Sequence, residues 1–291
     1  MKKSDMICQA CGNQSLQHYL TVRDHFLSKE EFDLLHCIHC DMLTTYPVPE
    51  DISRYYDSED YLSHQFTKKN LITALYKFIR DVQVNNKLDL IGSYHSAGSL
   101  LDVGCGTGYF LKTAQTNGYH VSGVEINTGA RQVAQELIQI PIYASLSDIK
   151  ESAFDIITLW HVLEHLPKPV TQFQRLHSLL SSKGTLLIAV PNYKSKDAVH
   201  YKEYWAGYDV PRHLYHFSQQ SIHKLADKTG FIIERVVPMK YDSFYVSLLS
   251  ERYKNSGPTA YINAFIQGMR SNMSASGSTE YSSLIYVLQK V

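Results

Sequence analysis

The feature that most constrains the fold is an alternation of short apolar runs with amphipathic segments, which begins at Ser99 and continues to the end of the chain. The expected strands cover 99–103, 120–125, 140–143, 154–160, 184–190, 231–237 and 283–289, and the expected helices cover 67–91, 109–117, 128–137, 170–180 and 218–228. Strands that alternate with helices of this length predict an α/β fold with a mostly parallel, doubly wound sheet and helices on both faces. The small polar segment 271–278 is expected to be a loop.

A glycine-rich turn follows the first of these strands. Gly104, Gly106 and Gly108 lie between the strand at 99–103 and the helix that begins at Tyr109. Glycine lets a ligand approach the backbone closely, and a helix N-terminus offers free N–H groups to an anion. The dinucleotide-binding pattern G-x-G-x-x-G requires a glycine where this chain has Tyr109. We therefore expect the turn to hold a group smaller than a pyrophosphate.

Two acidic residues end neighbouring strands close to this turn. Glu125 ends the strand at 120–125, where a carboxylate can accept hydrogen bonds from both hydroxyls of a ribose. Asp102, near the end of the first strand, either orients the glycine turn or meets an ammonium group of the ligand. Together with the turn, Glu125 predicts a site for a ribose-containing cofactor.

Four of the five cysteines form two pairs with C-x2-C spacing near the N-terminus. These are Cys8 with Cys11 and Cys37 with Cys40, whereas Cys105 lies apart in the glycine turn. In a reducing compartment, two such pairs indicate a metal site rather than disulfides. Four thiolates satisfy the tetrahedral preference of Zn²⁺ and leave no open position, so we expect a structural zinc ribbon and not a catalytic metal.

Several ordered segments in the second half of the chain carry a family resemblance. The segment 101–108 (LDVGCGTG), followed by 123–125 (GVE), resembles the cofactor motifs of the class I S-adenosylmethionine-dependent methyltransferases. The segments 154–157 (FDII), 160–165 (WHVLEH) and 182–192 resemble the fourth strand, the turn after it and the fifth strand of that family. The resemblance covers about half of the chain, and it implies a Rossmann-like sheet of seven strands in which the segment 283–289 inserts antiparallel.

The resemblance also implies which residues hold the S-adenosylmethionine. The three glycines would contact its methionine part, Glu125 its ribose and Ile126 its adenine. Ser145 stands where the family often has an acidic residue, so backbone groups of Ser145 and Leu146 are expected at the adenine instead. The predicted cofactor site comprises Asp102, Gly104, Cys105, Gly106, Gly108, Tyr109, Glu125, Ile126, Ser145, Leu146, Trp160 and His161, the last two beside the sulfonium.

Four histidines are candidates for the base that removes a proton from the methyl acceptor. His161 and His165 follow the fourth strand, and His213 and His216 follow the fifth. Histidine titrates near neutral pH, which suits a general base. An alternative is that His165 only fixes the turn by a hydrogen bond to the backbone. His213 and His216 could likewise form one surface of a loop or helix.

Other residues near these histidines have both a functional and a structural interpretation. Arg212 could bind a carboxylate or phosphate of the acceptor, or pair with Asp209. Tyr204, Trp205 and Tyr208 could form an aromatic wall for the substrate, or pack in the core.

Charge argues against nucleic acid as the substrate. The chain has 28 basic and 28 acidic residues, so the formal net charge is zero. Residues 1–60 contain eleven acidic residues against five basic ones, which repels phosphate. The apolar runs are far shorter than a membrane span, and no apolar segment follows the basic N-terminus. We therefore expect a cytoplasmic protein that does not bind membranes; its oligomeric state is not defined by the sequence.

Three parts are predicted: a zinc-ribbon module at 1–60, a helical linker at 61–95 and an S-adenosylmethionine-dependent methyltransferase domain at 96–291. The resemblance implies methylation of a small molecule, a (nucleotide) sugar or a hydroxylated metabolite, at oxygen or carbon. The arrangement is similar to that of zinc-containing sugar C-methyltransferases. The segments 161–192 and 211–213 also resemble ubiquinone-biosynthesis-type and polysaccharide-associated O-methyltransferases. The alternatives are an rRNA or tRNA methyltransferase with a zinc module, and a protein that binds the cofactor without turnover.

Overall fold

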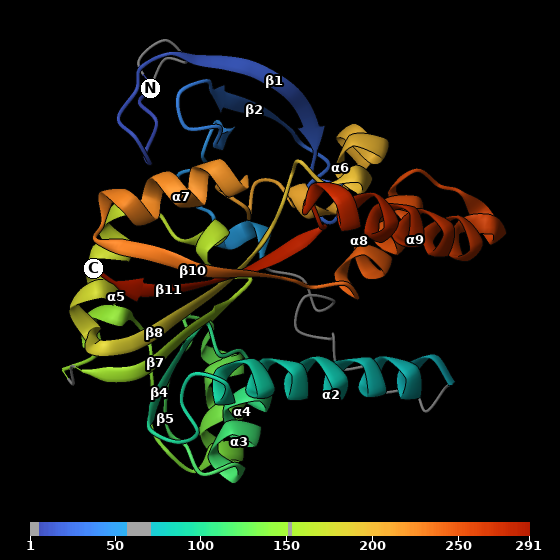
Figure 1. Cartoon of the computed structure of the whole chain (residues 1–291). Coiled ribbons are helices and arrows are strands. Elements are labelled where there is room, and N and C mark those ends of the chain that lie inside the picture. The colour runs from blue at the N-terminus through green and yellow to red at the C-terminus, as the bar shows by residue number, and fades with distance from the viewer. Residues whose placement is uncertain (1–5, 57–70, 151–152) are drawn as a thin grey trace.

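A seven-stranded sheet runs through the centre of the protein in this computed structural model, which describes residues 6–56, 71–150 and 153–291 (Figure 1). In spatial order the strands are β10 (Phe231–Pro238), β11 (Ser283–Lys290), β8 (Leu180–Pro191), β7 (Phe154–Trp160), β4 (Ser99–Val103), β5 (His120–Val124) and β6 (Ile142–Tyr143). The strands from β8 to β6 run parallel, and β11 lies antiparallel between β8 and β10. The predicted Rossmann-like sheet with an inserted last strand is therefore confirmed.

Helices cover both faces of this sheet because alternate residues of its strands point to opposite faces. In β8, Leu186 and Ile188 pack in one apolar core with α5 (Pro169–Leu179) and α7 (Gln219–Lys228). Leu187 and Ala189 pack in the other core. Three helices bury their apolar side chains in that second core: α2 (Leu71–Gly92), α3 (Tyr109–Thr116) and α4 (Thr128–Ile138). Figure 1 shows α2, α3 and α4 on one side of the sheet and α7 on the other.

A second, smaller sheet joins the N-terminal segment to the rest of the chain. Its order is β1 (Leu16–Arg23), β2 (Glu31–Cys37), β3 (Leu43–Tyr46) and β9 (Tyr215–His216). The last strand, β9, comes from the segment that follows β8 of the large sheet. The N-terminal strands therefore share their sheet with a segment of the C-terminal half of the chain. Cys8, Cys37 and Cys40 share a core with residues of β7, β8 and α7. The N-terminal segment is thus packed firmly on the α7 side of the molecule (Figure 1).

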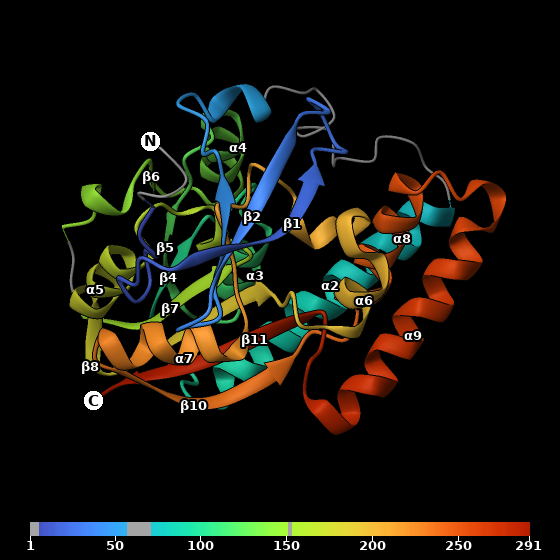
Figure 2. The same cartoon turned by 90° about the horizontal axis from the view of Figure 1, so that it is seen from above.

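Two long helices near the C-terminus lie at the edge of the molecule, and one of them differs from the expectation of the sequence analysis. α8 (Asp242–Tyr253) and α9 (Ala260–Ser278) form a pair that Figure 2 shows at the edge of the molecule, close to α6 (Lys196–Tyr201). The expectation of a loop at 271–278 is wrong, because this segment is the last part of α9. Small residues of α9 face inward at helical spacing: Ala264, Gly268, Ser271 and Ala275 are buried. Here small side chains are a packing surface and not a sign of irregular structure.

The strands and helices expected for the large sheet agree with the observed boundaries to within a few residues, and β8 begins four residues earlier than expected. The strands of the smaller sheet, α6, α8 and the first part of α9 were not expected. The first part of the helix expected at 67–91 and the boundary at 60–61 lie outside the described residues. The division into parts at 1–60, 61–95 and 96–291 stays a prediction. Among the residues that the structure describes, no helix is both long and apolar enough to pass through a membrane.

Candidate active site

The glycine turn lies at the carboxyl end of β4, beside the point where the strand order reverses between β4 and β7. Gly104, Gly106 and Gly108 all have positive φ (72°, 54° and 82°), which residues with a side chain rarely adopt. A Cβ atom at Gly104 would lie 2.4 Å from a methyl carbon of Val162, so no side chain fits there. A Cβ atom at Gly106 would meet nothing within 4 Å, so this part of the turn borders open space. The turn can therefore receive a ligand at Gly106.

Glu125 lies directly after β5 and faces the glycine turn. Its Oε2 accepts a hydrogen bond from the Gly106 N–H and its Oε1 accepts one from the Asn127 N–H, both at 2.8 Å. A carboxylate oxygen has two lone pairs, so each oxygen keeps one for a further donor. This geometry fits a ribose whose two hydroxyls donate to one fixed carboxylate.

Asp102 is buried under the turn. Its Oδ1 accepts a hydrogen bond of 2.6 Å from the Thr158 hydroxyl. Burial raises the pKa of Asp102 to about 7, although Thr158 and the nearby Lys87 favour the charged form. The role of Asp102 toward the cofactor stays a prediction.

The other predicted cofactor residues differ in their exposure and in their contacts. Cys105 is buried, whereas Ile126 is 85% exposed. Tyr109 is half-exposed beneath the guanidinium of Arg80. Ser145 caps the short 3-10 helix Leu146–Asp148, and Asp148 accepts a hydrogen bond from the Ser145 N–H. At Trp160, the indole N–H is buried without a hydrogen-bond partner in the described part of the chain.

The turn after β7 brings two ionisable side chains together. His161 has a φ of 58°, and its Nε2 lies 3.0 Å from Oδ2 of Asp242 at the start of α8. Its Nδ1 lies 3.5 Å from Oε1 of Glu164, which is an ion-pair separation and long for a hydrogen bond. Burial alone would lower the pKa of His161, but these two carboxylates outweigh it and raise the pKa to about 9. At neutral pH His161 is therefore protonated, which does not suit a general base.

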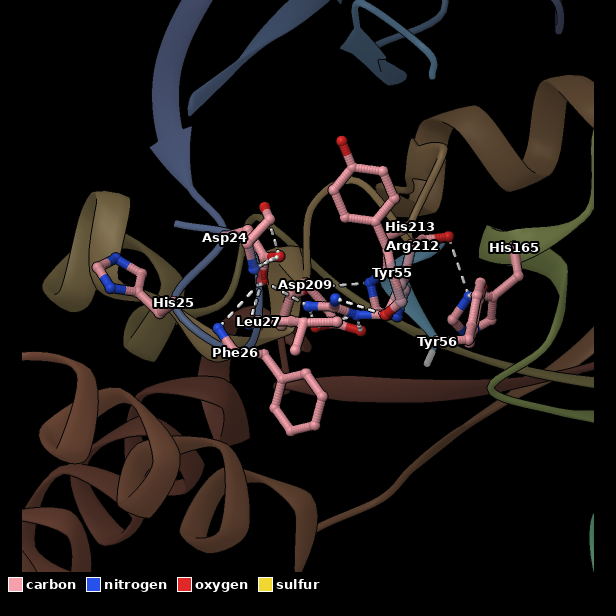
Figure 3. A network of polar contacts seen from close by, with 12 residues as sticks. Asp24, His25, Phe26, Leu27, Tyr55, Tyr56, His165, Asp209, Arg212 and His213 are labelled. Atoms are coloured by element: carbon pink, nitrogen blue, oxygen red, sulfur yellow. Dashed lines mark hydrogen bonds and ion pairs between the residues drawn. The ribbon is translucent and has the colours of Figure 1, made fainter. Parts of the chain in front are cut away.

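His165 and His213 lie against each other although 48 positions separate them in the chain (Figure 3). Their ring centroids are 4.6 Å apart. Nδ1 of His165 lies 3.0 Å from the carbonyl oxygen of Arg212, and Nδ1 of His213 lies 3.0 Å from that of Gly207. Burial and the neighbouring His165 lower the pKa of His213 to about 4, so its imidazole is neutral at pH 7.

His216 takes a structural position in β9. Its ring is buried, and its Nε2 lies 3.0 Å from the hydroxyl oxygen of Thr45 in β3. Burial lowers the pKa of His216 well below its usual value. The structure brings His161, His165 and His213 close to the same carboxylate, that of Glu164. His216 is not part of this cluster.

A buried ion-pair network supports this arrangement from the N-terminal side (Figure 3). The guanidinium of Arg212 donates to Asp209 at 2.7 Å, to Asp24 at 2.9 Å and to the carbonyl oxygen of Tyr55 at 3.1 Å. The pairing of Arg212 with Asp209 is thus observed. Asp24 was not expected from the sequence, because no local pattern relates residues 188 positions apart.

The aromatic residues near Arg212 pack mainly in the core. Trp205 and Tyr208 are fully buried among apolar side chains of β1, β2 and the segment 193–210. The indole N–H of Trp205 donates to Asp197 at 2.8 Å. Tyr204 is partly exposed, and its ring lies 5.3 Å from that of His25.

The four N-terminal cysteines converge at one point. Sγ of Cys8 lies 3.4 Å from Sγ of Cys40, and Sγ of Cys11 lies 3.5 Å from Sγ of Cys37. A disulfide would require about 2.05 Å, whereas two sulfurs on one tetrahedral zinc lie about 3.8 Å apart. All four Sγ atoms lie within 4.8 Å of one another, so the residues fit a zinc ion.

A mostly parallel sheet with this strand order, a glycine turn after its first strand and an acidic residue after its second define a class I methyltransferase fold. The family model for the methyltransferase domain matches residues 77–236, which is more than half of the chain. The chain therefore belongs to the methyltransferase domain family.

Individual relatives are distant. The ubiquinone biosynthesis O-methyltransferase of Paraburkholderia phytofirmans is 23% identical over 158 residues, which are 51% of this chain and 65% of that protein. The enzyme of the same name from Alkalilimnicola ehrlichii is 27% identical over 33% of this chain and 43% of its own length. This chain thus spans less than two thirds of the length of these curated relatives.

Solved structures agree in fold at low sequence identity. Magnesium protoporphyrin IX methyltransferase of Synechocystis PCC 6803, with bound SAH, has a TM-score of 0.51 at 17% identity and covers 82% of this chain and 92% of its own. An N-methyltransferase of Haemonchus contortus, in complex with phosphomonomethylethanolamine and S-adenosylhomocysteine, has a TM-score of 0.53 at 17% identity over 95% of this chain and 68% of its own.

Proposed function

We propose that the protein transfers a methyl group from S-adenosylmethionine to a small-molecule acceptor. The observation that carries this proposal is the carboxylate of Glu125, fixed by two backbone N–H groups and facing a glycine turn that borders open space. Glu125 would bind the ribose, and Gly104, Gly106 and Gly108 would contact the methionine part. Trp160 and His161 would lie at the sulfonium, because Trp160 ends the neighbouring strand β7 and His161 follows it. The cofactor supplies the activated methyl group.

The acceptor is proposed to bind beside the turn at residues 161–165. Methyl transfer from a sulfonium is an in-line displacement, so the main task of the protein is to position two reactants with water excluded. An acceptor hydroxyl or carbon acid must also lose a proton. His165 and His213 are the better candidates for this step, since His161 is protonated at neutral pH and His216 is bonded to Thr45.

The acceptor class that we propose is a (nucleotide) sugar or a hydroxylated metabolite, methylated at oxygen or carbon. The relatives in the comparison include ubiquinone biosynthesis O-methyltransferases, which supports a small-molecule acceptor. The acidic excess of residues 1–60 disfavours RNA. The first sixty residues are proposed to hold a structural zinc through Cys8, Cys11, Cys37 and Cys40. Zinc would stabilise the module, and with four thiolate ligands it would offer no open position to a substrate.

Calorimetry with S-adenosylmethionine tests the cofactor site. We expect the wild type to bind, and Glu125→Ala to bind at least tenfold more weakly, because one carboxylate accepts both ribose hydroxyls. Glu136→Ala, which removes an exposed acidic residue from α4, should bind like the wild type. Absence of binding by the wild type, or equal binding by both variants, would contradict the proposal.

Transfer of a labelled methyl group then identifies the acceptor. The protein is incubated with labelled S-adenosylmethionine and with nucleotide sugars, phenols or small RNAs. We expect label in a sugar or phenol. Label in RNA would overturn the small-molecule acceptor, and cofactor binding without transfer to any of them would favour a non-catalytic protein.

A further inference from the structure

The side chain of Glu164 raises a question that the proposed cofactor site does not answer. It is 1% exposed, and neither of its carboxylate oxygens has a hydrogen-bond partner among the residues that the structure describes. Burying an ionised carboxylate is costly unless it is paired, hydrogen-bonded or bound to a metal. Its nearest cationic neighbour, His161, lies at 3.5 Å and makes its shorter contact, 3.0 Å, with Asp242. Among the described residues, the carboxylate is therefore held only by this long ion-pair contact with His161, and both of its oxygens can accept a further ligand.

Two histidines beside Glu164 are held in the form that binds metals. A backbone carbonyl only accepts hydrogen bonds, so the Nδ1 atoms of His165 and His213 carry their protons toward Arg212 and Gly207. The hydroxyl oxygen of Tyr56 lies 3.1 Å from the same Nδ1 atom of His165, where it can share this proton as a second acceptor. Each imidazole then keeps the lone pair of its Nε2 atom. A hydrogen bond from the other ring nitrogen to a backbone carbonyl is the usual way in which proteins orient a metal-binding histidine.

The three side chains also have the separation that a metal site needs. Nε2 of His213 lies 4.0 Å from Oε1 of Glu164, and one ligand atom from each of Glu164, His165 and His213 lies within 4.8 Å of the other two. Ligands at about 2.1 Å on a tetrahedral metal lie about 3.4 Å apart. A contraction of these separations by at most about 1.4 Å would therefore bring all three onto one ion.

We propose that Glu164, His165 and His213 bind one divalent transition-metal ion, at a site separate from the four N-terminal cysteines. Two imidazoles and one carboxylate suit Fe²⁺, Co²⁺ or Zn²⁺, whereas Mg²⁺ and Ca²⁺ prefer oxygen ligands. Three protein ligands leave at least one coordination position open, in contrast to the closed cysteine set.

The open position gives the ion a role, which rests on the proposed methyl transfer. The site lies in the same turn as His161, where we place the sulfonium end of the cofactor. With both imidazoles bound to the ion, neither His165 nor His213 would accept the proton. An acceptor oxygen bound to the metal would instead lose its proton to water more easily, because the ion stabilises the resulting anion. Its electron pair then forms the bond to the methyl carbon, the carbon–sulfur bond breaks with its pair on sulfur, and S-adenosylhomocysteine leaves. The acceptor class is thereby narrowed to one with an ionisable hydroxyl.

Titration with Co²⁺ tests the site without using activity. In protein that holds one zinc per chain, at the cysteines, we expect one Co²⁺ per chain with weak visible absorption and no thiolate charge-transfer band, since the ligands are nitrogen and oxygen. Glu164→Gln and His213→Gln should each weaken Co²⁺ binding at least tenfold, because each removes one of three ligands. Glu136→Gln and His177→Gln, which change the same residue types on α4 and α5, should bind Co²⁺ like the wild type.

A second measurement does not depend on any variant. In wild-type protein with ¹⁵N-labelled histidine, Zn²⁺ added beyond the cysteine site should shift the Nε2 resonances of two histidines and leave the remaining ones in place. Absence of Co²⁺ binding with a nitrogen–oxygen spectrum, absence of these shifts, or wild-type affinity in both Glu164→Gln and His213→Gln would overturn the metal site.

The outcome for the cofactor is separate. If the protein binds S-adenosylmethionine but has no Co²⁺ site, the metal-site proposal is refuted and the proposed function is retained. If the protein binds Co²⁺ at this site but does not bind S-adenosylmethionine, the metal site is retained and the proposed function is refuted.

Discussion

At the scale of single residues, Arg212 connects the segments that carry the candidate site. It is 1% exposed, and its guanidinium joins Asp24 of the N-terminal segment to Asp209 of the segment that carries His213. Its carbonyl oxygen orients His165. A single buried residue thus links the N-terminal segment and the loop before β9 through its side chain, and the turn after β7 through its backbone carbonyl. Its contacts explain why it is an arginine: the five donors of a planar guanidinium reach Asp24, Asp209 and the carbonyl oxygen of Tyr55 at once.

Replacing Arg212 by methionine should destabilise the protein by about 3–5 kcal/mol, because Asp24 and Asp209 would stay buried without their partner. Burial alone would raise the pKa of Asp24, but Arg212 and backbone N–H groups hold it below its usual value. The stabilisation from Asp24 is therefore present above about pH 4 and is lost as the pH falls through the lowered pKa.

Urea unfolding at several pH values measures this difference. The gap in the free energy of unfolding between wild type and Arg212→Met should be largest near neutral pH and should narrow in acid. Arg235→Met, at an exposed position of β10, should change the free energy of unfolding by less than about 0.5 kcal/mol. An equal effect of the two substitutions would refute the structural role of Arg212.

At the scale of elements, the pair α8–α9 depends on small residues along one face of α9. A Cβ atom at Gly268 would lie 2.6 Å from a ring carbon of Phe244 in α8. Ser271, one turn further, is buried, and its hydroxyl donates to Asp197 at 2.6 Å. Close approach of the two helices therefore requires glycine at 268. In contrast, a Cβ atom at Gly277, near the end of α9, would meet nothing within 4 Å.

The two glycines provide a matched pair of substitutions. Gly277→Ala should leave stability unchanged or raise it by up to about 1 kcal/mol, since alanine is the better helix former. Gly268→Ala should lower stability by about 1–3 kcal/mol despite the same gain in propensity, because the added methyl group overlaps Phe244. Thermal unfolding followed by circular dichroism compares them, and stabilisation by both would mean that α8 and α9 are not packed this closely.

At the scale of the whole molecule, the proposed zinc module is part of the structural core and not an appendage. β3 pairs with β9, and the ammonium group of Lys228 in α7 donates to the carbonyl oxygen of Ala10 at 3.0 Å. Three of the four cysteines lie in the same apolar core as β7 and β8. Any loss of order around the cysteines should therefore weaken the large domain as well.

Removal of zinc is the corresponding experiment. Elemental analysis of freshly purified protein should find one zinc per chain, and Cys37→Ser should abolish it, whereas Cys105→Ser should retain it. A chelator should lower the melting temperature of a single transition that involves the whole molecule, because metal-binding energy is folding energy. Clearly less than one zinc per chain, or a large domain that melts unchanged after chelation, would contradict this view.

Much of the fold could be predicted from the sequence because it depends on local patterns. Apolar residues at spacings of two and of three to four located nearly all strands and helices of the large sheet, and the glycines with positive φ located the turn that we propose as the cofactor site. The small residues of α9 misled the prediction at 271–278, since a buried surface of small side chains has the composition of a loop. The four converging cysteines were indicated by their spacing alone.

The sequence by itself thus determined the order of the elements, the class of the fold and the residues that end each strand. Only the tertiary structure decided which side chains meet: His213 with Glu164, Arg212 with Asp24, and His161 with Asp242. The physical reason is that periodicity and backbone conformation depend on neighbours in the chain, whereas charge pairing and metal-ligand geometry depend on positions that only the packed sheet brings together.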